Sequence, residues 1–206
     1  MVSLYLIFYA YLEFWFPDVE TNPCPWHPVP EACRILCSNV WGLSKNLSDV
    51  TVALSQHDLL LCSETLFSDR CHMSELLVPG FGRPVLLCWD GVPRARGMAA
   101  YVRVGYGAFR QPKFECGYCE MLVFRVCSAR QNFYVFSLYR NPNLDDRIYD
   151  CLLTAMAAMQ AADACASFLF VGDLTGHHQD WLGSITTNHY GVAALDLPLC
   201  QVVINW

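Results

Sequence analysis

The stretch from Ser167 to Asp173 constrains the fold more than any other part of the chain. Ser167–Val171 is a short, nearly all-apolar run that ends at a Gly, which is typical of a β-strand buried on both faces. Asp173 follows at once, so its carboxylate lies at a rigid strand end, where α/β proteins commonly build their sites. Asp173 is therefore a candidate functional residue, and the alternative is an Asp that caps the following turn.

Length and composition predict one domain, or one domain with a tail. The 206 residues are enough for a substantial hydrophobic core. Although 54% of the residues are hydrophobic, no uninterrupted apolar run reaches the roughly 18 residues of a membrane-spanning helix. The net charge of -6 argues against a surface that binds nucleic acid over its whole area.

The charge is unevenly distributed along the chain. Between Arg83 and Arg140 there are nine Lys or Arg residues and only three acids, Asp90, Glu115 and Glu120. This asymmetry predicts a locally basic middle region that could contact DNA weakly. The alternative is a set of sheet edges that Arg side chains protect from association.

The chain has twelve Cys residues, and most of them lie within apolar stretches. A Cys in such a stretch behaves as a small buried hydrophobe. We therefore expect reduced thiols and an intracellular protein, nuclear or cytoplasmic. Cys116 and Cys119 have the spacing of metal ligands, but no second pair follows to complete four ligands, so a zinc site is the minor alternative.

Residues 1–32 are predicted to lie outside the globular domain. Residues 2–16 are apolar and aromatic but lack a basic start and a small-residue cleavage site, so a secretory signal is weakly supported and membrane contact is not expected. Residues 18–25 resemble the terminal motif of ribosome-skipping peptides, which occur at the start of some retroelement polyproteins. Cys24 stands where those peptides have Gly. The prolines from Pro23 to Pro30 predict a linker.

The globular domain is predicted to span residues 33–206 and to begin with a strand–helix–strand unit. Strands are predicted at Arg34–Asn39 and Asp58–Ser63, with an amphipathic helix at Ser44–Gln56 between them. A polar residue marks the end of each strand, Asn39 for the first and Glu64 for the second.

Short strands and tight turns follow, and then a helix. Because no long helix interrupts the region from Val85 to Tyr139, its strands are predicted to run largely antiparallel. The predicted strands are Val85–Trp89, Met98–Val104, Glu120–Cys127 and Asn132–Leu138. A helix is predicted to begin near Asn143. Its predicted core face consists of Ile148, Leu152, Met156 and Met159.

Four predicted strand ends now carry polar residues, namely Asn39, Glu64, Tyr139 and Asp173. In this order they resemble the motifs of the endonuclease/exonuclease/phosphatase superfamily. The resemblance is greatest to the apurinic-endonuclease-like domain of non-LTR retrotransposons, whose polyproteins also carry a reverse transcriptase. The segments that support the resemblance are Ser38–Leu43, Asp58–Thr65, Arg96–Arg103, Tyr139–Pro142 and Val171–His178.

The resemblance implies an α/β fold with two packed mixed β-sheets flanked by helices. This is a four-layer α/β sandwich, here incomplete at the C-terminus. It also implies Mg²⁺-dependent cleavage of phosphodiester bonds, with Mn²⁺ as a substitute, DNA as the substrate and no small-molecule cofactor. The chemistry suits the residue types, because Mg²⁺ binds through one or two carboxylates plus water and offsets charge on phosphoryl oxygens.

The resemblance also assigns roles to the four strand-end residues. Glu64 holds the metal, and Asp173 orients or deprotonates the attacking water. Tyr139 steadies the phosphate through its hydroxyl group. Asn39 holds Glu64 or a metal-bound water.

Three further residues are predicted to contact the substrate, namely Thr175, Arg140 and Asn188. Thr175 stands where the family has an Asn, and a hydroxyl group cannot supply the reach of an amide. For Arg140 the alternative is a surface salt bridge. His177 and His178 are interpreted as loop structure, with metal ligation as the alternative.

The level of activity is a separate expectation. The family ends with an Asp-His pair that has no counterpart before Trp206, and the loss of a general acid/base costs orders of magnitude in rate. We therefore expect weak or no turnover from this chain. The alternatives are a non-catalytic retroelement remnant or interaction module, and a lipid or inositol phosphodiesterase or phosphatase of the same superfamily.

Overall fold

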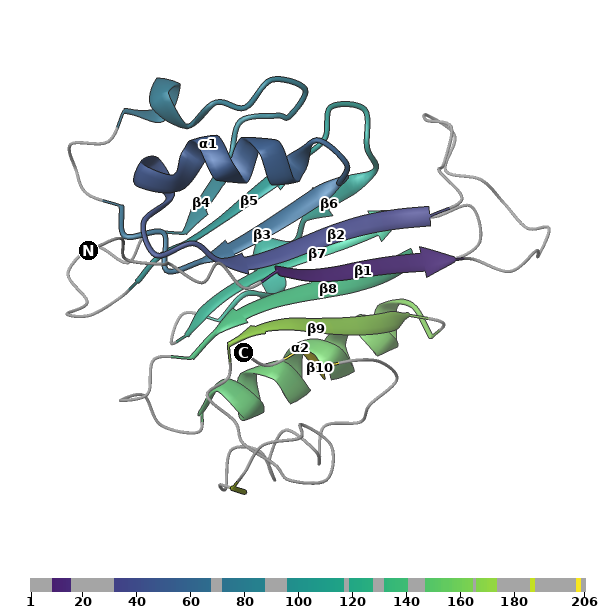
Figure 1. Cartoon of the computed structure of the whole chain (residues 1–206). Helices are drawn as coiled ribbons and strands as arrows, with labels where there is room; N and C mark the ends of the chain where they lie inside the picture. Colours follow the sequence, from purple (N-terminus) through teal and green to yellow (C-terminus); the bar gives the residue numbers. More distant parts are fainter. Residues whose placement is uncertain are drawn as a thin grey trace.

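Two β-sheets lie face to face between two helices in the structure, which is a computed structural model (Figure 1). The first sheet has the strand order β1 (Tyr9–Trp15), β2 (Ala32–Asn39), β3 (Leu59–Ser63), β5 (Met98–Val102) and β4 (Val85–Leu87). The second has the order β10 (Val203–Ile204), β9 (Ser167–Asp173), β8 (Asn132–Tyr139), β7 (Glu120–Cys127) and β6 (Ala108–Arg110). The structure describes residues 9–15, 32–67, 72–87, 96–116, 119–127, 132–140, 147–164, 166–173, 186–187 and 203–204.

The helices cover the outer faces of the two sheets. Helix α1 (Leu43–Leu54) lies over the first sheet and α2 (Arg147–Ala162) lies over the second (Figure 1). Two short 3-10 helices complete the elements, η1 (Met73–Leu76) and η2 (Pro112–Phe114). Among the described residues, no helix is long and apolar enough to cross a membrane.

Both sheets are mixed, and in each a parallel pair of strands ends at the candidate site. In the first sheet β2 and β3 are parallel, with Asn39 opposite Ser63. In the second, β8 and β9 are parallel, with Tyr139 opposite Asp173. The antiparallel strand β7 begins at the same end, because Glu120 pairs with Tyr139. We call the edge formed by the carboxyl ends of β2, β3, β8 and β9 the site edge.

Three hydrophobic clusters fill the spaces between the four layers. The alternation of side chains along each strand explains this division, because neighbouring residues point to opposite faces of a sheet. In β7, for example, Leu122 packs between the sheets, whereas Val123 packs against α2. The predicted core face of α2 is confirmed, since Ile148, Leu152 and Met159 are all buried in the outer cluster. The four-layer α/β sandwich predicted from the sequence is thus the observed fold.

The structure departs from the predicted elements at three places. Residues 9–15, predicted to precede the domain, form β1 and pair antiparallel with β2. The three-residue strand β6 had no sequence prediction. The antiparallel strands between Val85 and Tyr139 are divided between two sheets, with β4 and β5 in the first and β6 to β8 in the second.

One cysteine pair corrects the expectation that all thiols are reduced. Cys116, ahead of β7, is bonded to Cys151 in α2, and their Cα atoms are 6.0 Å apart. The described free cysteines are all buried, as predicted for Cys37, Cys62 and Cys127, and Cys33 and Cys119 are buried too. Burial raises the pKa of the Cys33 thiol to about 12, so this thiol stays protonated at neutral pH.

Several sequence predictions fall outside the described residues. They are the ribosome-skipping-like motif at 18–25, the substrate contacts Thr175 and Asn188, and the His177–His178 pair.

Candidate functional site

Glu64 follows β3 in a left-handed backbone conformation that residues other than Gly rarely adopt. Its φ is +52°, and Leu66, two residues on, has φ +50°. Each such residue costs about 1–2 kcal/mol relative to the right-handed form. The conformation is held by hydrogen bonds from neighbouring loops, since Gly42 N–H donates to the Glu64 carbonyl at 2.8 Å and Leu66 N–H donates to the Arg96 carbonyl at 2.8 Å. Strain held in place by surrounding structure is a common property of functional sites.

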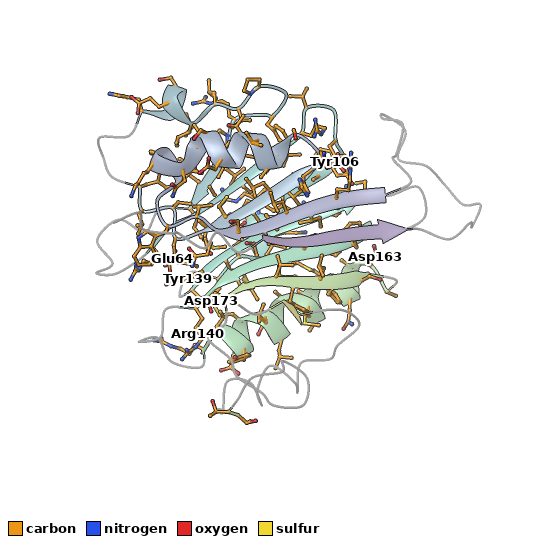
Figure 2. All side chains as sticks on the ribbon, viewed as in Figure 1. Glu64, Tyr106, Tyr139, Arg140, Asp163 and Asp173 are labelled. Carbon is orange, nitrogen blue, oxygen red and sulfur yellow. A yellow bond between two sulfur atoms is a disulfide. The ribbon has the colours of Figure 1, made fainter. Side chains whose placement is uncertain are left out.

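The Glu64 carboxylate joins the two sheets. It is buried, with 7% of the residue exposed, and its Oε1 accepts a hydrogen bond from the Tyr139 hydroxyl at 3.0 Å. Its Oε2 lies 3.4 Å from Nη1 of Arg96, which is a loose ion pair with a partly exposed guanidinium. Figure 2 shows Glu64 and Tyr139 close together at the site edge, near Asp173 and Arg140. This hydrogen bond joins two residues that are 75 positions apart in the sequence.

Tyr139 is held as a hydrogen-bond donor. Burial is the main cause that raises the pKa of its hydroxyl, followed by the charge of Glu64 and the hydrogen bond to it. The Arg96 charge acts in the opposite direction, and the charge of Asp173 adds to the increase. The hydroxyl is therefore protonated throughout the neutral and mildly alkaline range. The influence of Asp173 on this pKa places the two predicted catalytic residues in one electrostatic environment.

Asp173 is the last residue of β9, as predicted, and pairs with Tyr139 across the parallel strands. Its backbone carbonyl accepts a hydrogen bond from Arg140 N–H at 2.7 Å, so the register of β8 and β9 continues to the strand ends. Gly172 makes this register possible, because a Cβ at that position would lie 1.9 Å from the Leu138 carbonyl oxygen. The side chain of Asp173 is partly exposed, unlike those of Glu64 and Tyr139.

For Asn39 and Arg140 the structure bears on one alternative each, namely contact of Asn39 with Glu64 and a surface salt bridge of Arg140. The Asn39 side-chain oxygen accepts a hydrogen bond from the Trp41 N–H at 3.3 Å, so the structure links Asn39 to the loop after β2 and not to Glu64. Arg140 is 1% exposed, so the alternative of a surface salt bridge is wrong. Both residues nevertheless lie at the site edge, at the ends of β2 and β8.

Arg96 and Glu120 also belong to the site, although neither was predicted from the sequence to have a role there. The buried Glu120 carboxylate accepts hydrogen bonds from Arg96 N–H at 3.0 Å and from Gly97 N–H at 2.7 Å. Burial raises the pKa of Glu120, the two N–H groups lower it, and the negative charge of Glu64 raises it again. Glu120 thus fixes the backbone that presents Arg96 to Glu64. The sequence signal for Glu120 was an acidic residue at the start of the apolar strand β7. Such a residue is ordinarily interpreted as solvent-exposed.

The residues present are compatible with a magnesium ion. Within the described ranges, no three His, Cys, Asp or Glu side chains come together as a closed metal cage. Mg²⁺ does not need one, because it commonly binds through one or two carboxylates and keeps several waters. Glu64 is such a carboxylate, since one oxygen is oriented by Tyr139 and the other faces a partly exposed cation that a metal ion could displace. The same donor set suits Mn²⁺.

Comparison with known proteins shows which fold this is. No protein-family model matches the sequence, and no curated protein does. The endonuclease domain of TRAS1, a telomere-specific non-LTR retrotransposon, superposes with a TM-score of 0.55 at 14% identity, over 79% of this chain and 69% of that one. The chain shares the fold of this domain. The AP endonuclease LMAP of Leishmania major gives a TM-score of 0.57 at 16% identity, over 77% of this chain and 60% of its own length.

A third solved structure agrees with the first two. The APE2 catalytic domain of Xenopus laevis has a TM-score of 0.51 at 15% identity, over 70% of this chain and 59% of its own length. The predicted resemblance to apurinic-endonuclease-like domains is therefore confirmed for the fold. The chain spans about three fifths of the LMAP structure and of the APE2 catalytic domain.

Proposed function

We propose that this chain is a nuclease-like domain of retrotransposon origin that cleaves DNA phosphodiester bonds with Mg²⁺ or Mn²⁺. One observation carries the proposal. The hydrogen bond between Tyr139 and Glu64 brings together the ends of β8 and β3, which belong to different sheets, with Asp173 in register beside them. The structural neighbours support it, because all three named structures are endonucleases or their catalytic domains.

The chain's own residues divide the work in this proposal. Glu64 holds the cation, which offsets charge on the phosphoryl oxygens when it is bound. Tyr139 keeps the Glu64 carboxylate in one orientation and offers a neutral hydroxyl to the phosphate. Asp173, partly exposed at the end of β9, orients and deprotonates the attacking water. Thr175 and Asn188 contact the substrate.

We further propose that turnover is low. Protonation of the leaving oxygen needs an acid, and a correctly placed general acid contributes about 10²–10⁴-fold to the rate. Among the described site-edge residues, Glu64 is committed to Tyr139 and Arg96, and Glu120 is committed to two backbone N–H groups. Neither of these carboxylates is placed to serve as that acid.

The experiment is plasmid nicking by the purified chain, with and without Mg²⁺. We expect slow nicking that requires the metal and disappears in Glu64→Gln, which keeps the shape of the side chain but removes its charge. Glu75→Gln, at an exposed position of η1, is the matched control and should nick at the wild-type rate. Nicking that survives Glu64→Gln contradicts the assignment of the metal to Glu64.

A second candidate function has one observation in its favour. The Arg96–Glu64 ion pair already neutralises the carboxylate that the metal needs, as expected in a domain that keeps the fold and binds partners without catalysis. Mn²⁺ binding, measured by electron paramagnetic resonance, separates the two functions. A Glu64-dependent Mn²⁺ site supports the nuclease, and absence of binding at millimolar Mn²⁺ supports the non-catalytic domain.

A further inference from the structure

Trp41 is a large aromatic residue exposed at the site edge. It follows β2 by two residues, 49% of its surface is exposed, and its backbone adopts φ +43°. Its backbone N–H donates a hydrogen bond to the side-chain oxygen of Asn39, which holds the loop after β2 in place. A single exposed aromatic residue is ordinary on a protein surface. Trp41 differs from such a residue because it contacts the Arg96 side chain and lies at the site edge.

The partner is Arg96. Its guanidinium carbon lies 5.1 Å from the centre of the Trp41 ring, which is the geometry of a cation–π contact. The same guanidinium lies 3.4 Å from Oε2 of Glu64. A single side chain therefore links the exposed ring to the carboxylate at the centre of the site. The backbone N–H of Arg96 donates a hydrogen bond to the buried Glu120 carboxylate, which fixes the position of Arg96.

A second exposed apolar side chain extends the surface around Trp41. Leu66 is 42% exposed and lies beside Gly42, the residue that follows Trp41. Its Cδ1 atom would be in van der Waals contact with a Cβ atom placed on Gly42. The loops after β2 and β3 thus present an apolar rim beside a cation and a buried carboxylate. A flat, apolar face next to positive charge is the combination that proteins use to stack nucleobases.

We propose that Trp41 and Arg96 form a nucleobase-stacking subsite, in which one base next to the scissile phosphate stacks on the Trp41 ring. This inference rests on the proposed DNA-cleaving function and adds a substrate class to it. Inside a duplex both faces of each base are already stacked. The subsite therefore accepts a base that is unpaired, terminal, opposite a gap or extruded from the helix.

The test measures binding of fluorescently labelled single-stranded oligonucleotides in EDTA, so that cleavage does not enter. Stacking on an aromatic side chain contributes about 1–3 kcal/mol per base, so Trp41→Ala should raise the Kd about 5- to 150-fold. Trp41→Phe should retain most of the affinity, because Phe also offers an aromatic face. Phe109→Ala is the matched control, since Phe109 is 46% exposed on β6, outside the site, and its loss should leave the Kd unchanged.

A scan of the oligonucleotide makes the test specific. Each base in turn is replaced by an abasic spacer, and one position should weaken binding to the wild type. The same replacement should have no further effect on Trp41→Ala, as a double-mutant cycle requires for a direct contact. Equal affinities for wild type and Trp41→Ala, or a Trp41→Phe variant as weak as Trp41→Ala, would overturn the subsite.

The outcome for the subsite can be distinguished from that for the proposed function. Glu64-dependent nicking without any effect of Trp41→Ala on binding overturns the subsite and leaves the nuclease intact. A wild-type chain that neither binds oligonucleotide nor nicks plasmid overturns both. Circular dichroism and thermal melting of Trp41→Ala and Trp41→Phe establish that the changes in Kd arise in folded protein.

Discussion

The two sheets supply the site in different ways. The first sheet contributes Glu64 from the irregular loops after β2 and β3, in which Trp41, Glu64 and Leu66 all have positive φ. The second contributes Tyr139 and Asp173 from the last residues of regular parallel strands. One half is therefore held by loop hydrogen bonds that offset local strain, and the other by strand register.

This difference predicts how each half fails. Register is shared along a whole ladder, so a single clash within it disturbs the entire strand pair. A strained turn is local, and its loss moves a few side chains while the sheet behind it remains. We therefore expect mutations in the second half to act mainly on stability. Mutations in the first half should act mainly on the geometry of Glu64 and Arg96.

The largest effect is expected from Gly172→Ala in the second half. The new Cβ would meet the Leu138 carbonyl oxygen at 1.9 Å, and the φ of +129° is a conformation that Ala rarely adopts. Steric clash with backbone and strain add, so the free energy of unfolding should fall by about 4 kcal/mol or more. Urea denaturation followed by circular dichroism measures this change.

The control for this variant is Gly80→Ala. Gly80 has φ +83°, but nothing lies within 4 Å of the position that its Cβ would take. Only the conformational cost of about 1–2 kcal/mol applies there. Equal losses at Gly80 and Gly172 would show that the close approach of β9 to β8 does not hold the register.

A smaller effect is expected from Glu120→Ala, which removes the support of the first half. Two buried N–H groups, of Arg96 and Gly97, lose their acceptor. The free energy of unfolding should fall by about 3 kcal/mol, the cost of leaving such donors unpaired. The same variant should also displace Arg96, so Glu64-dependent nicking should change together with stability.

Glu120 also makes stability depend on pH. Because burial raises its pKa, the folded chain binds this proton more tightly than the unfolded chain does. The contribution of Glu120 is then greatest below its unfolded pKa of roughly 4.5 and is lost as the pH rises through the folded value. As the pH rises from acidic to neutral, the free energy of unfolding of the wild type should therefore fall relative to that of Glu120→Gln. A pH-independent difference would contradict this.

Tyr139→Phe tests the hydrogen bond that joins the halves. The hydroxyl donates to a buried carboxylate, and hydrogen bonds to charged groups contribute about 1.5–3 kcal/mol. The nicking rate should fall about 10- to 100-fold while the fold remains, since Phe keeps the buried ring. Single-turnover nicking at saturating Mg²⁺ measures the rate. A wild-type rate in Tyr139→Phe would mean that strand register alone orients Glu64.

The sequence allowed a good prediction of the fold and of the residues at strand ends. Apolar runs such as Phe168–Val171 and Leu59–Cys62 mark buried strands, and the polar residue after each run must lie at an edge. This rule located Glu64 and Asp173 without knowledge of their partners. The short strand β6 has too few residues for a periodic pattern, so it could not be predicted in the same way.

Contacts between the sheets could not be predicted. The support of Arg96 by Glu120 spans 24 residues and depends on which strands enter which sheet. Likewise, the apolar segment at residues 9–15 fits a leader as well as an edge strand until its pairing with β2 is known. Periodicity records which face of a strand is buried, but it carries no information on which strand lies opposite.

The smallest effect is expected from Asn39→Ala in the first half. Its side chain accepts one hydrogen bond, at 3.3 Å, from the exposed Trp41 N–H. A hydrogen bond of this kind contributes about 0.5 kcal/mol to the free energy of unfolding, because water can replace the lost acceptor. The loop that carries Trp41 should loosen, so oligonucleotide affinity should fall less than in Trp41→Ala. Urea denaturation and the EDTA binding assay measure both quantities. A loss of nicking as complete as in Glu64→Gln would instead show that Asn39 acts at the reacting phosphate, and would make the turn after β2 part of the catalytic machinery.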